Sequence, residues 1–287
     1  FTTCFLSKQL GAKRTIARIS NTEFIKDCNE IDFDLIGIDE LISPENLAAA
    51  EIKLIISESA FTNSHDFDDG ILKMMAVRLE KNAPFVGKTV MEAASVFPGV
   101  HFMPIALKRE DSDSTIIPRG NTIFCECDHV YFITNKKGLK ELYNLMGTEK
   151  QKVKNVMILG AGRVGSKLSK DLSLEGLNIK LIEINEQKAN DIAEELPNLM
   201  VLNVDGRNLD LLVEENLESM DAFIATSGDS ETNIMSCMMA KSKKVKKTIA
   251  LVENMDYFNL SQSIGIDSLI NKKLLAANDI FKFVRNG

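Results

Sequence analysis

The chain has 287 residues, of which 45% are apolar, and its formal net charge is −7. This composition excludes a largely disordered chain and predicts about two domains, each with its own hydrophobic core. The acidic balance argues against a nucleic-acid-binding protein, because phosphate binding needs a basic surface. No apolar run approaches the roughly twenty residues that span a bilayer, and no signal peptide is visible. Five scattered cysteines suit a reducing cytoplasm.

Residues 1–65 resemble a later part of the same chain. Shifted by 233 residues, "CFLSKQLGAKRTIARISNTEF" at 4–24 aligns with "CMMAKSKKVKKTIALVENMDY" at 237–257, and the register continues to Asp34 over Asp267. After a short insertion, "LAAAEI" at 47 aligns with "LAANDI" at 275. We interpret this as a duplication. Residues 1–65 are then the C-terminal part of a first nucleotide-binding domain, and the opening, which reads as mid-helix, suggests a fragment.

Residues 70–147 have a different pattern. "MAVRLEKNAPFVGKTVMEAA" reads as a strand, a turn and a helix. "VHFMPIALKRE" and "TIIPRGNTIFCECDHVYFIT" read as strands, and "KKGLKELYNLMG" as a closing helix. This order predicts a small α+β domain, and the polar stretch "GTEKQKVK" is the linker that follows it.

Residues 152–287 alternate apolar runs with amphipathic segments. The runs are "NVMILG", "NIKLIEI", "LMVLNV", "DAFIAT", "KTIALV" and "DSLI". Because each run is apolar throughout and is followed by helical spacing, the pattern predicts a parallel sheet covered on both faces. The fold class is therefore α/β, a Rossmann-like doubly wound sheet. Gly176 is expected to stop one helix, and Asn185 to cap the next.

A glycine-rich turn follows the first of these strands. Gly160, Gly162 and Gly165 form GxGxxG between a strand and a helix. Gly160 would permit the tight turn, Gly162 would let the backbone approach a pyrophosphate, and Gly165 would let the helix pack close to the strand. The phosphates would then lie at the helix N-terminus. Together with the acidic residue downstream, this spacing predicts a nucleotide site.

Polar residues end the next three strands. Glu183 ends the second strand, where a carboxylate can accept two ribose hydroxyls and would repel a 2′-phosphate, which disfavours NADP. Asp205 and the pair Thr226-Ser227 end the third and fourth strands. Since ligands of open α/β sheets bind beyond these carboxyl ends, we expect them at the same pocket. Ordinary turn chemistry is the alternative reading for both.

Catalytic chemistry at this site has little support. A dehydrogenase needs a proton donor near the nicotinamide, and residues 152–287 contain no histidine. Cys125, Cys127 and His129 would share a strand face and could face a metal, but a fourth ligand is lacking, and buried small cysteines are the preferred reading. An NAD-dependent oxidoreductase is the alternative function. A redox-sensing DNA-binding regulator would need a helix-turn-helix, which is not evident.

With these motifs in place, the chain resembles the regulator of K+ conductance family, the regulatory proteins of potassium uptake. "GAGRVG", "LIEIN", "ATSGDSETNIMSCMMAK" and "TIALVENMDY" match its nucleotide domain. "FVGKTVMEA" and "IIPRGNTIFCECDHVYFIT" match its C-type domain. The resemblance covers essentially the whole chain. It implies a truncated first nucleotide domain at 1–65, a C-type domain at 70–147 and a second nucleotide domain at 152–287, with a final C-type domain missing.

The resemblance also implies roles for particular residues. The family's phosphate contacts fall on Gly160, Ala161, Gly162, Arg163 and Val164, beside Gly165. Its ribose carboxylate falls on Glu183, and its later contacts on Asp205, Thr226 and Ser227. An arginine near the adenine matches Arg18 in the first copy, whereas Leu251 occupies the equivalent place in the second. Cys127 stands where the family more often has a turn glycine.

The function that the resemblance implies is regulatory. The expected effector is NAD or NADH, with ATP or ADP as the alternative, and the ligand would act as a signal rather than as a substrate. The expected partner is an integral membrane potassium-translocating subunit of the TrkH/TrkG type. Homo-oligomers, as a dimer or a tetrameric ring, would lie in the cytoplasm against the inner face of the cell membrane.

Overall fold

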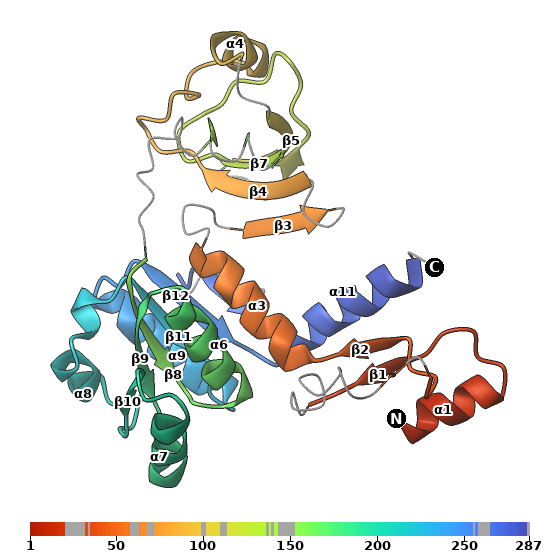
Figure 1. Cartoon of the computed structure of the whole chain (residues 1–287). Coiled ribbons are helices and arrows are strands. Elements are labelled where there is room, and N and C mark those ends of the chain that lie inside the picture. Colours follow the sequence, from red (N-terminus) through yellow and green to blue (C-terminus); the bar gives the residue numbers. More distant parts are fainter. Residues whose placement is uncertain are drawn as a thin grey trace. The chain divides into compact units, whose positions relative to one another are not determined.

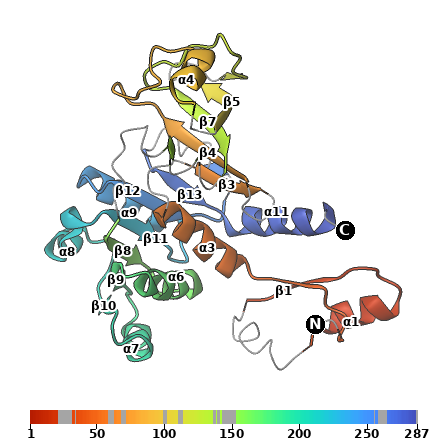
Figure 2. The same cartoon turned by 45° about the horizontal axis from the view of Figure 1, so that its top comes forward.

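A computed structural model of the chain describes most of its residues. The described ranges are 1–20, 32–33, 35–57, 63–67, 72–98, 102–109, 114–135, 138, 141–142, 153–254, 256–257 and 265–285. The chain forms two compact units, one of residues 1–53 with 154–287 and one of residues 54–153. Figure 1 shows the elements of both units, and Figure 2 shows them from a second direction.

A complete doubly wound domain fills the second half of the chain. Its elements are β8 (Asn155–Leu159), α6 (Arg163–Leu174), β9 (Asn178–Ile182), α7 (Glu186–Glu195), β10 (Met200–Leu202), α8 (Leu209–Glu214), the 3₁₀ turn η3 (Leu217–Ser219), β11 (Ala222–Ala225), α9 (Ser230–Ser242), β12 (Lys247–Leu251), β13 (Ser268–Ile270) and α11 (Lys272–Arg285). The six strands pair in parallel in the order β10-β9-β8-β11-β12-β13. The order reverses between β9 and β11, so the switch point of the sheet lies at β8. The predicted α/β Rossmann-like class is confirmed.

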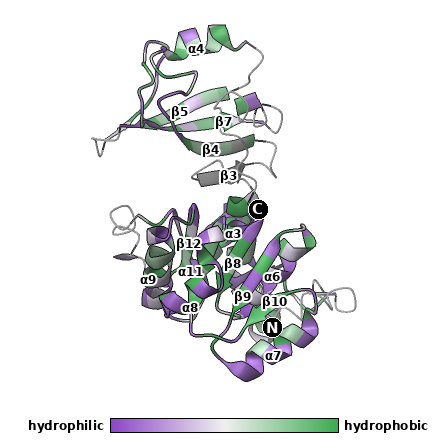
Figure 3. Cartoon of the chain, turned by 90° about the vertical axis from the view of Figure 1, so that its left-hand side faces the viewer, coloured by the Kyte–Doolittle hydropathy of each residue, from purple (hydrophilic) through white to green (hydrophobic). Residues whose placement is uncertain are grey.

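Both faces of this sheet are covered. Successive strand residues point to opposite faces, and residues 156–159 of β8 are all buried. Met157 and Leu159 belong to a core that also contains Leu212 of α8 and Cys237 of α9. On α6 the buried residues Val164, Leu168 and Leu172 recur at helical spacing, as the sequence predicts. Figure 3 shows the mixed hydrophilic and hydrophobic residues along α6 and α7 that such half-buried helices need.

The helix boundaries follow the predicted signals. Gly176 lies just past the end of α6 with φ +81°, a left-handed conformation that glycine adopts without steric cost. Asn185 caps α7, because its side chain accepts a hydrogen bond from the Lys188 N–H at 2.9 Å. Asp229 caps α9 in the same way, accepting from the Thr232 N–H at 2.7 Å. These caps fix where each helix begins relative to the strand before it.

A polar clamp joins α9, β12 and β13 at the amino end of the sheet. The Asp267 carboxylate accepts from Lys241 Nζ at 2.7 Å and from both the N–H and the hydroxyl of Thr248 at 2.8 Å. Nearby, the Cys237 thiol donates to the carbonyl of Ile249 at 3.3 Å. These contacts satisfy the N–H and the hydroxyl of Thr248 near the start of β12, and they hold α9 in register with the sheet.

The first segment repeats this clamp. It contains α1 (Thr2–Gln9), β1 (Ile16–Arg18), β2 (Glu40–Ile42) and α3 (Pro44–Ser57), with β1 and β2 paired in parallel. Asp39 accepts from Lys8 Nζ at 2.8 Å, and from the N–H of Thr15 at 2.5 Å and its hydroxyl at 3.1 Å. The Cys4 thiol donates to the Ile16 carbonyl at 3.5 Å. Each of these contacts is the counterpart of one in the second copy, which supports the duplication.

The clamp also corrects the register of the repeat. The predicted alignment places Asp34 on Asp267, but Asp34 lies outside the described residues and Asp39 makes the equivalent contacts. Thr15 and Asp39 are 24 residues apart, whereas Thr248 and Asp267 are 19 apart, so the first copy carries five extra residues before its second strand. The insertion therefore falls earlier than predicted.

The other compact unit contains the expected α+β elements. Its antiparallel sheet has the order β3-β4-β7-β5-β6, and α4 (Val90–Val96) begins with a capping box of Thr89 and Glu92. The strands are β3 (Asn63–Phe67), β4 (Leu72–Arg78), β5 (Phe102–Lys108), β6 (Thr115–Ile116) and β7 (His129–Thr134). Phe85, Phe124 and Phe132 are fully buried in its core. The closing helix predicted at 136–147 lies largely outside the described residues.

Candidate nucleotide-binding site

The glycine turn after β8 has the geometry that its predicted role requires. Gly160 has φ +95°, and a Cβ there would lie 2.8 Å from the backbone nitrogen of Ser227. A Cβ on Gly165 would lie 1.9 Å from the Gly160 carbonyl oxygen, so only glycine lets α6 pack this close to β8. Gly162 is the N-cap of α6, and a Cβ on it would meet only the Thr226 carbonyl, at 3.8 Å. The turn is therefore tight at both ends and open in its middle.

The non-glycine residues of the turn differ in what they can offer a ligand. Ala161 and Val164 are 1% and 4% exposed, so their side chains belong to the core. Arg163, the first residue of α6, is exposed. Ser166 donates from its hydroxyl to the Ala161 carbonyl at 2.9 Å and so fixes the turn. A ligand at this turn would meet backbone N–H groups and the positive end of the α6 dipole.

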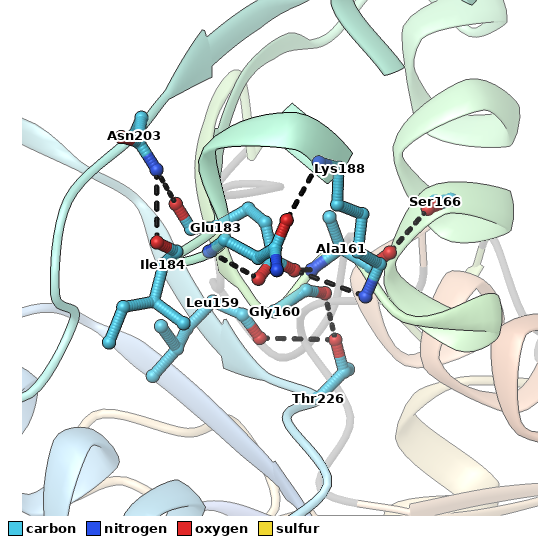
Figure 4. Close-up of polar contacts among 10 residues, drawn as sticks. Leu159, Gly160, Ala161, Ser166, Glu183, Ile184, Lys188, Asn203 and Thr226 are labelled. Atoms are coloured by element: carbon cyan, nitrogen blue, oxygen red, sulfur yellow. Dashed lines mark hydrogen bonds and ion pairs between the residues drawn. The ribbon is translucent and has the colours of Figure 1, made fainter. Parts of the chain in front are cut away.

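Glu183 lies across from this turn, at the carboxyl end of β9 (Figure 4). One carboxylate oxygen, Oε2, accepts from the Ala161 N–H at 3.0 Å and pairs with Lys188 Nζ at 3.2 Å. The other, Oε1, accepts from the Asn185 N–H at 3.0 Å. Burial raises the pKa of the Glu183 carboxyl, but these donors outweigh burial and bring its pKa below the usual value. The predicted ribose carboxylate is therefore ionised and held in place by the glycine turn itself.

Lys188 and Asn203 are residues of this corner that sequence reasoning missed. Lys188 lies in the first turn of α7, and its side chain is 46% exposed. Asn203 donates from its amide to the carbonyls of Glu183, at 2.9 Å, and Ile184, at 3.1 Å. A lysine one turn after an acidic strand end is a signal that the sequence does contain, because α7 brings it back over that strand end.

Asp205 does not end the third strand, as predicted, but lies three residues beyond β10, where it pairs with Arg207, a third residue that the sequence analysis did not identify. The Arg207 guanidinium donates from Nε to Oδ1 at 3.0 Å and from Nη2 to Oδ2 at 2.8 Å. This fork holds the pKa of the Asp205 carboxyl below its usual value. Between them, Gly206 packs against Leu159, whose Cδ1 would lie 2.1 Å from a Cβ there. The loop is thus pressed onto the end of β8.

The end of β11 is fastened by hydrogen bonds. Thr226 donates from its hydroxyl to the carbonyls of Leu159, at 3.1 Å, and Gly160, at 3.0 Å. Ser227 donates from its N–H at 2.9 Å and its hydroxyl at 2.7 Å to Oδ1 of Asn233, a buried residue of α9. Thr226 and the Ser227 N–H are therefore occupied by the fold, and the Ser227 hydroxyl oxygen accepts from the Asp229 N–H at 3.3 Å.

These residues surround a pocket of about 350 Å³ at the switch point of the sheet. Its lining consists of Leu159, Gly160, Gly162, Ile182, Glu183, Ile184, Lys188, Asp205, Gly206, Arg207, Thr226, Ser227, Gly228 and Thr232. Six of the predicted site residues are thus brought together: Gly160, Gly162, Glu183, Asp205, Thr226 and Ser227. Among the described residues, no histidine, tyrosine or cysteine belongs to the lining.

Other predicted site residues lie elsewhere. Arg18 is the exposed last residue of β1, in the two-stranded sheet of the first segment, and it does not line this pocket. Ala161, Arg163, Val164 and Gly165 belong to the turn and the start of α6 but are not in the lining. Binding of a ligand by any of these predicted residues stays a prediction.

The cysteine pair in the other unit does not have the geometry considered from the sequence. Cys125 to Asp128 form a turn, in which Cys127 has φ +64° and its N–H donates to the Leu79 carbonyl at 2.8 Å, and β7 begins only at His129. The three residues therefore do not share one strand face. The preferred reading of buried cysteines is also wrong for Cys125, which is exposed. Among the described residues, no group of three or more potential ligands is placed to hold a metal.

Comparison with known proteins agrees with this architecture. The TrkA-N domain model matches residues 156–272, and the TrkA-C domain model matches residues 74–147. The chain therefore contains a TrkA-N domain and a TrkA-C domain. The resemblance to regulators of K+ conductance stated from the sequence is thereby confirmed.

Curated members of the TrkA family align along almost the whole chain. The Trk system potassium uptake protein TrkA of Haemophilus influenzae is 31% identical over 273 residues, which are 95% of this chain and 59% of that protein. TrkA homolog 2 of Methanosarcina mazei is 29% identical over 270 residues, or 94% of this chain and 59% of that protein. The chain therefore spans less than two thirds of the length of these relatives.

Solved structures show the same fold. The crystal structure of the GsuK RCK domain superimposes with a TM-score of 0.64 at 18% identity, over 96% of this chain and 58% of that one. The GsuK channel bound to NAD gives a TM-score of 0.63 at 18% identity, over 98% of this chain and 49% of that one. Within the part of the chain that the structure describes, no helix is long and apolar enough to cross a membrane.

Proposed function

We propose that the chain is a nucleotide-binding regulatory component of a Trk-type potassium-uptake system and not an enzyme. The observation that carries the proposal is the Glu183 carboxylate, which accepts from the Ala161 N–H of the glycine turn at 3.0 Å, in a pocket whose described lining residues include no histidine, tyrosine or cysteine. Relatives named as Trk potassium uptake proteins, and an NAD-bound channel of the same fold, support the same role.

The proposed ligand is NAD or NADH, with ATP or ADP as the alternative. The phosphates would lie at the N-terminus of α6, on the open middle of the glycine turn at Gly162, with Arg163 beside them. The ribose hydroxyls would donate to Glu183, and the adenine would lie toward Asp205. These are the roles that residues at the same positions have in doubly wound nucleotide-binding folds. For the first copy, we propose that Arg18 lies near the adenine at the equivalent site.

The bound nucleotide would act as a signal. It would favour one conformation of a homo-oligomer, as a dimer or a tetrameric ring, through its differential affinity for the available conformations. The oligomer would lie in the cytoplasm against an integral membrane potassium-translocating subunit of the TrkH/TrkG type and shift its conductance.

Calorimetric titration of the chain with NAD, NADH, ATP and ADP tests the proposal, together with Glu183→Gln. The change removes charge from a group that accepts two hydrogen bonds and pairs with Lys188, so binding should weaken by about 10- to 100-fold. Glu195→Gln is the matched control, because Glu195 is the last residue of α7, the helix that follows Glu183, and it does not line the pocket. NADH absorbance is followed with small carbonyl compounds. Turnover lost in Glu183→Gln would favour the oxidoreductase, and no binding of any nucleotide would refute the site.

A further inference from the structure

Two cations at the pocket have no part in the proposed contacts with an unmodified ribose. Lys188 and Arg207 follow β9 and β10, the strands whose carboxyl ends receive the adenosine half of a dinucleotide in this fold. Their side chains are 46% and 66% exposed. A pocket for an unmodified ribose needs one acidic acceptor for the two hydroxyls and no cation. Lys188 and Arg207 are therefore candidates for contacts with another group of the ligand.

The two cations differ in how firmly they are held. Arg207 engages both oxygens of Asp205 through a planar fork, which favours that arrangement, and the nearby Asp229 carboxylate adds attraction. Lys188 makes one ion pair among the described residues, to Glu183 Oε2 at 3.2 Å. The Lys188 side chain is 46% exposed and that of Glu183 is 8% exposed, so the pair reaches the surface through the ammonium. Because an ammonium carries three N–H donors, Lys188 can donate to a ligand while it stays paired with Glu183, whereas the Arg207 fork is engaged on both oxygens of Asp205.

The position of Lys188 decides which ligand atom it can reach. Its ammonium lies on the same oxygen of Glu183 that faces the glycine turn, and ribose hydroxyls bound to Glu183 would lie beside it. The carboxylate and the ammonium together are electrically neutral, and the N-terminus of α7 adds a partial positive charge. The exposed Glu186 in the same turn opposes an anion, but water and salt screen it.

We propose that Lys188 lets this pocket accept a phosphate on the 2′ carbon of the adenosine ribose, so that it binds NADPH as well as NADH. The inference rests on the proposed nucleotide site and changes its specificity. The expectation that Glu183 excludes a 2′-phosphate considers the carboxylate alone, whereas the folded pocket presents it already neutralised by Lys188. On binding, the ammonium would lie between the Glu183 carboxylate and the phosphate and donate to both, and Glu183 would keep its bonds to Ala161 and Asn185.

The test is a fluorescence titration of the chain with NADH and with NADPH, repeated on Lys188→Gln. Wild type should bind NADPH with a dissociation constant within about tenfold of that for NADH. Lys188→Gln should weaken NADPH by about tenfold or more, since a charge-assisted hydrogen bond is lost, and should change NADH binding less than threefold. Rising salt should weaken NADPH more than NADH in wild type alone.

Lys167→Gln is the matched control. It removes one positive charge from the same domain, where Lys167 pairs with Asp171 on α6 at 3.0 Å, outside the pocket lining. This variant should bind both nucleotides like wild type. NADH binding without NADPH binding would overturn the inference and leave the proposed function standing, as would equal losses of both ligands in Lys188→Gln. Binding of neither by wild type would defeat the nucleotide site itself.

Discussion

Burial affects two titratable side chains of the nucleotide domain differently. Glu183 is 7% exposed, but it is surrounded by donors, and its pKa falls below the usual value. Lys247, the first residue of β12, is 8% exposed, and burial lowers the pKa of its ammonium to about 8, although Asp267 acts to raise it. The two pKa values differ because hydrogen bonds to the charged form of Glu183 outweigh the effect of burial, whereas the attraction of Asp267 does not outweigh the burial of Lys247.

The Lys247 ammonium gives the domain a pH dependence with a definite sign. The unfolded chain keeps this proton up to its usual pKa of 10.5, whereas the folded chain loses it near 8. Between these values the unfolded state binds more protons, so the free energy of unfolding should rise with pH, by at most about 1.4 kcal/mol per pH unit. Urea denaturation of wild type and Lys247→Met from pH 7 to 10 measures this. If the free energies of unfolding of wild type and Lys247→Met differ by an amount that does not change with pH, the lowered pKa of Lys247 is contradicted.

At the scale of elements, α9 supports the pocket although few of its residues line it. Asn233 accepts twice from Ser227, and its amide donates to the carbonyls of Ser227, at 3.1 Å, and Leu251, at 2.8 Å. Ser236 donates from its hydroxyl to the Gly206 carbonyl at 3.3 Å. One helix therefore holds the loops after β10 and β11 and the end of β12. A nucleotide that moved either loop would act on α9.

Replacing the amide of Asn233 tests this supporting role. Asn233→Ala removes the amide that donates to the buried Leu251 carbonyl, and we expect a loss of about 2–4 kcal/mol in the free energy of unfolding together with weaker nucleotide binding. Met235→Ala is the control, because Met235 lies on the same helix but is 62% exposed, and it should stay within about 0.5 kcal/mol of wild type. Chemical denaturation and nucleotide titration measure both effects. An Asn233→Ala protein as stable as its control would refute the role.

At the scale of the whole molecule, one polar clamp occurs in two different sheets. Asp39 and Asp267 make equivalent contacts, and their side chains are both 31% exposed. Asp267 serves a six-stranded sheet, whereas Asp39 serves β1 and β2, which pair only with each other among the described strands. A two-stranded sheet has little independent stability in water. Loss of the clamp at Asp267 should therefore destabilise the whole six-stranded domain, whereas loss of the clamp at Asp39 should affect β1 and β2 alone.

Hydrogen exchange on Asp39→Asn and Asp267→Asn compares the two copies. Asp267→Asn should lower protection throughout β8, β11 and β12, because it weakens the cooperative unit by about 1–3 kcal/mol. Asp39→Asn should raise exchange in residues 16–18 and 40–42 and leave 247–251 protected. Equal spreading of the effect from both substitutions would show that the first segment unfolds together with the complete domain.

Most of the nucleotide domain could be predicted from the sequence, because the signals for its strands, its glycine turn and its helix ends are local. The six apolar runs, the glycine turn, and the stops and caps at Gly176 and Asn185 depend on neighbouring residues, and the structure has them where they were expected. Sequence reasoning missed Lys188, Arg207 and Asn233, whose roles depend on side chains brought together by the fold. It also misplaced the insertion in the repeat, since nothing local distinguishes Asp34 from Asp39 as the partner of Thr15.

The sequence by itself determined the fold class, the repeat and the position of the pocket, because periodicity, glycine spacing and strand ends are properties of a linear pattern. Only the tertiary structure decided the electrostatic state of that pocket. Glu183 is a lone carboxylate in the sequence and a neutralised, hydrogen-bonded one in the fold, because α7 returns Lys188 to within 3.2 Å of it. Charges interact through distance in space and the surrounding dielectric, and a sequence specifies neither until the chain is folded.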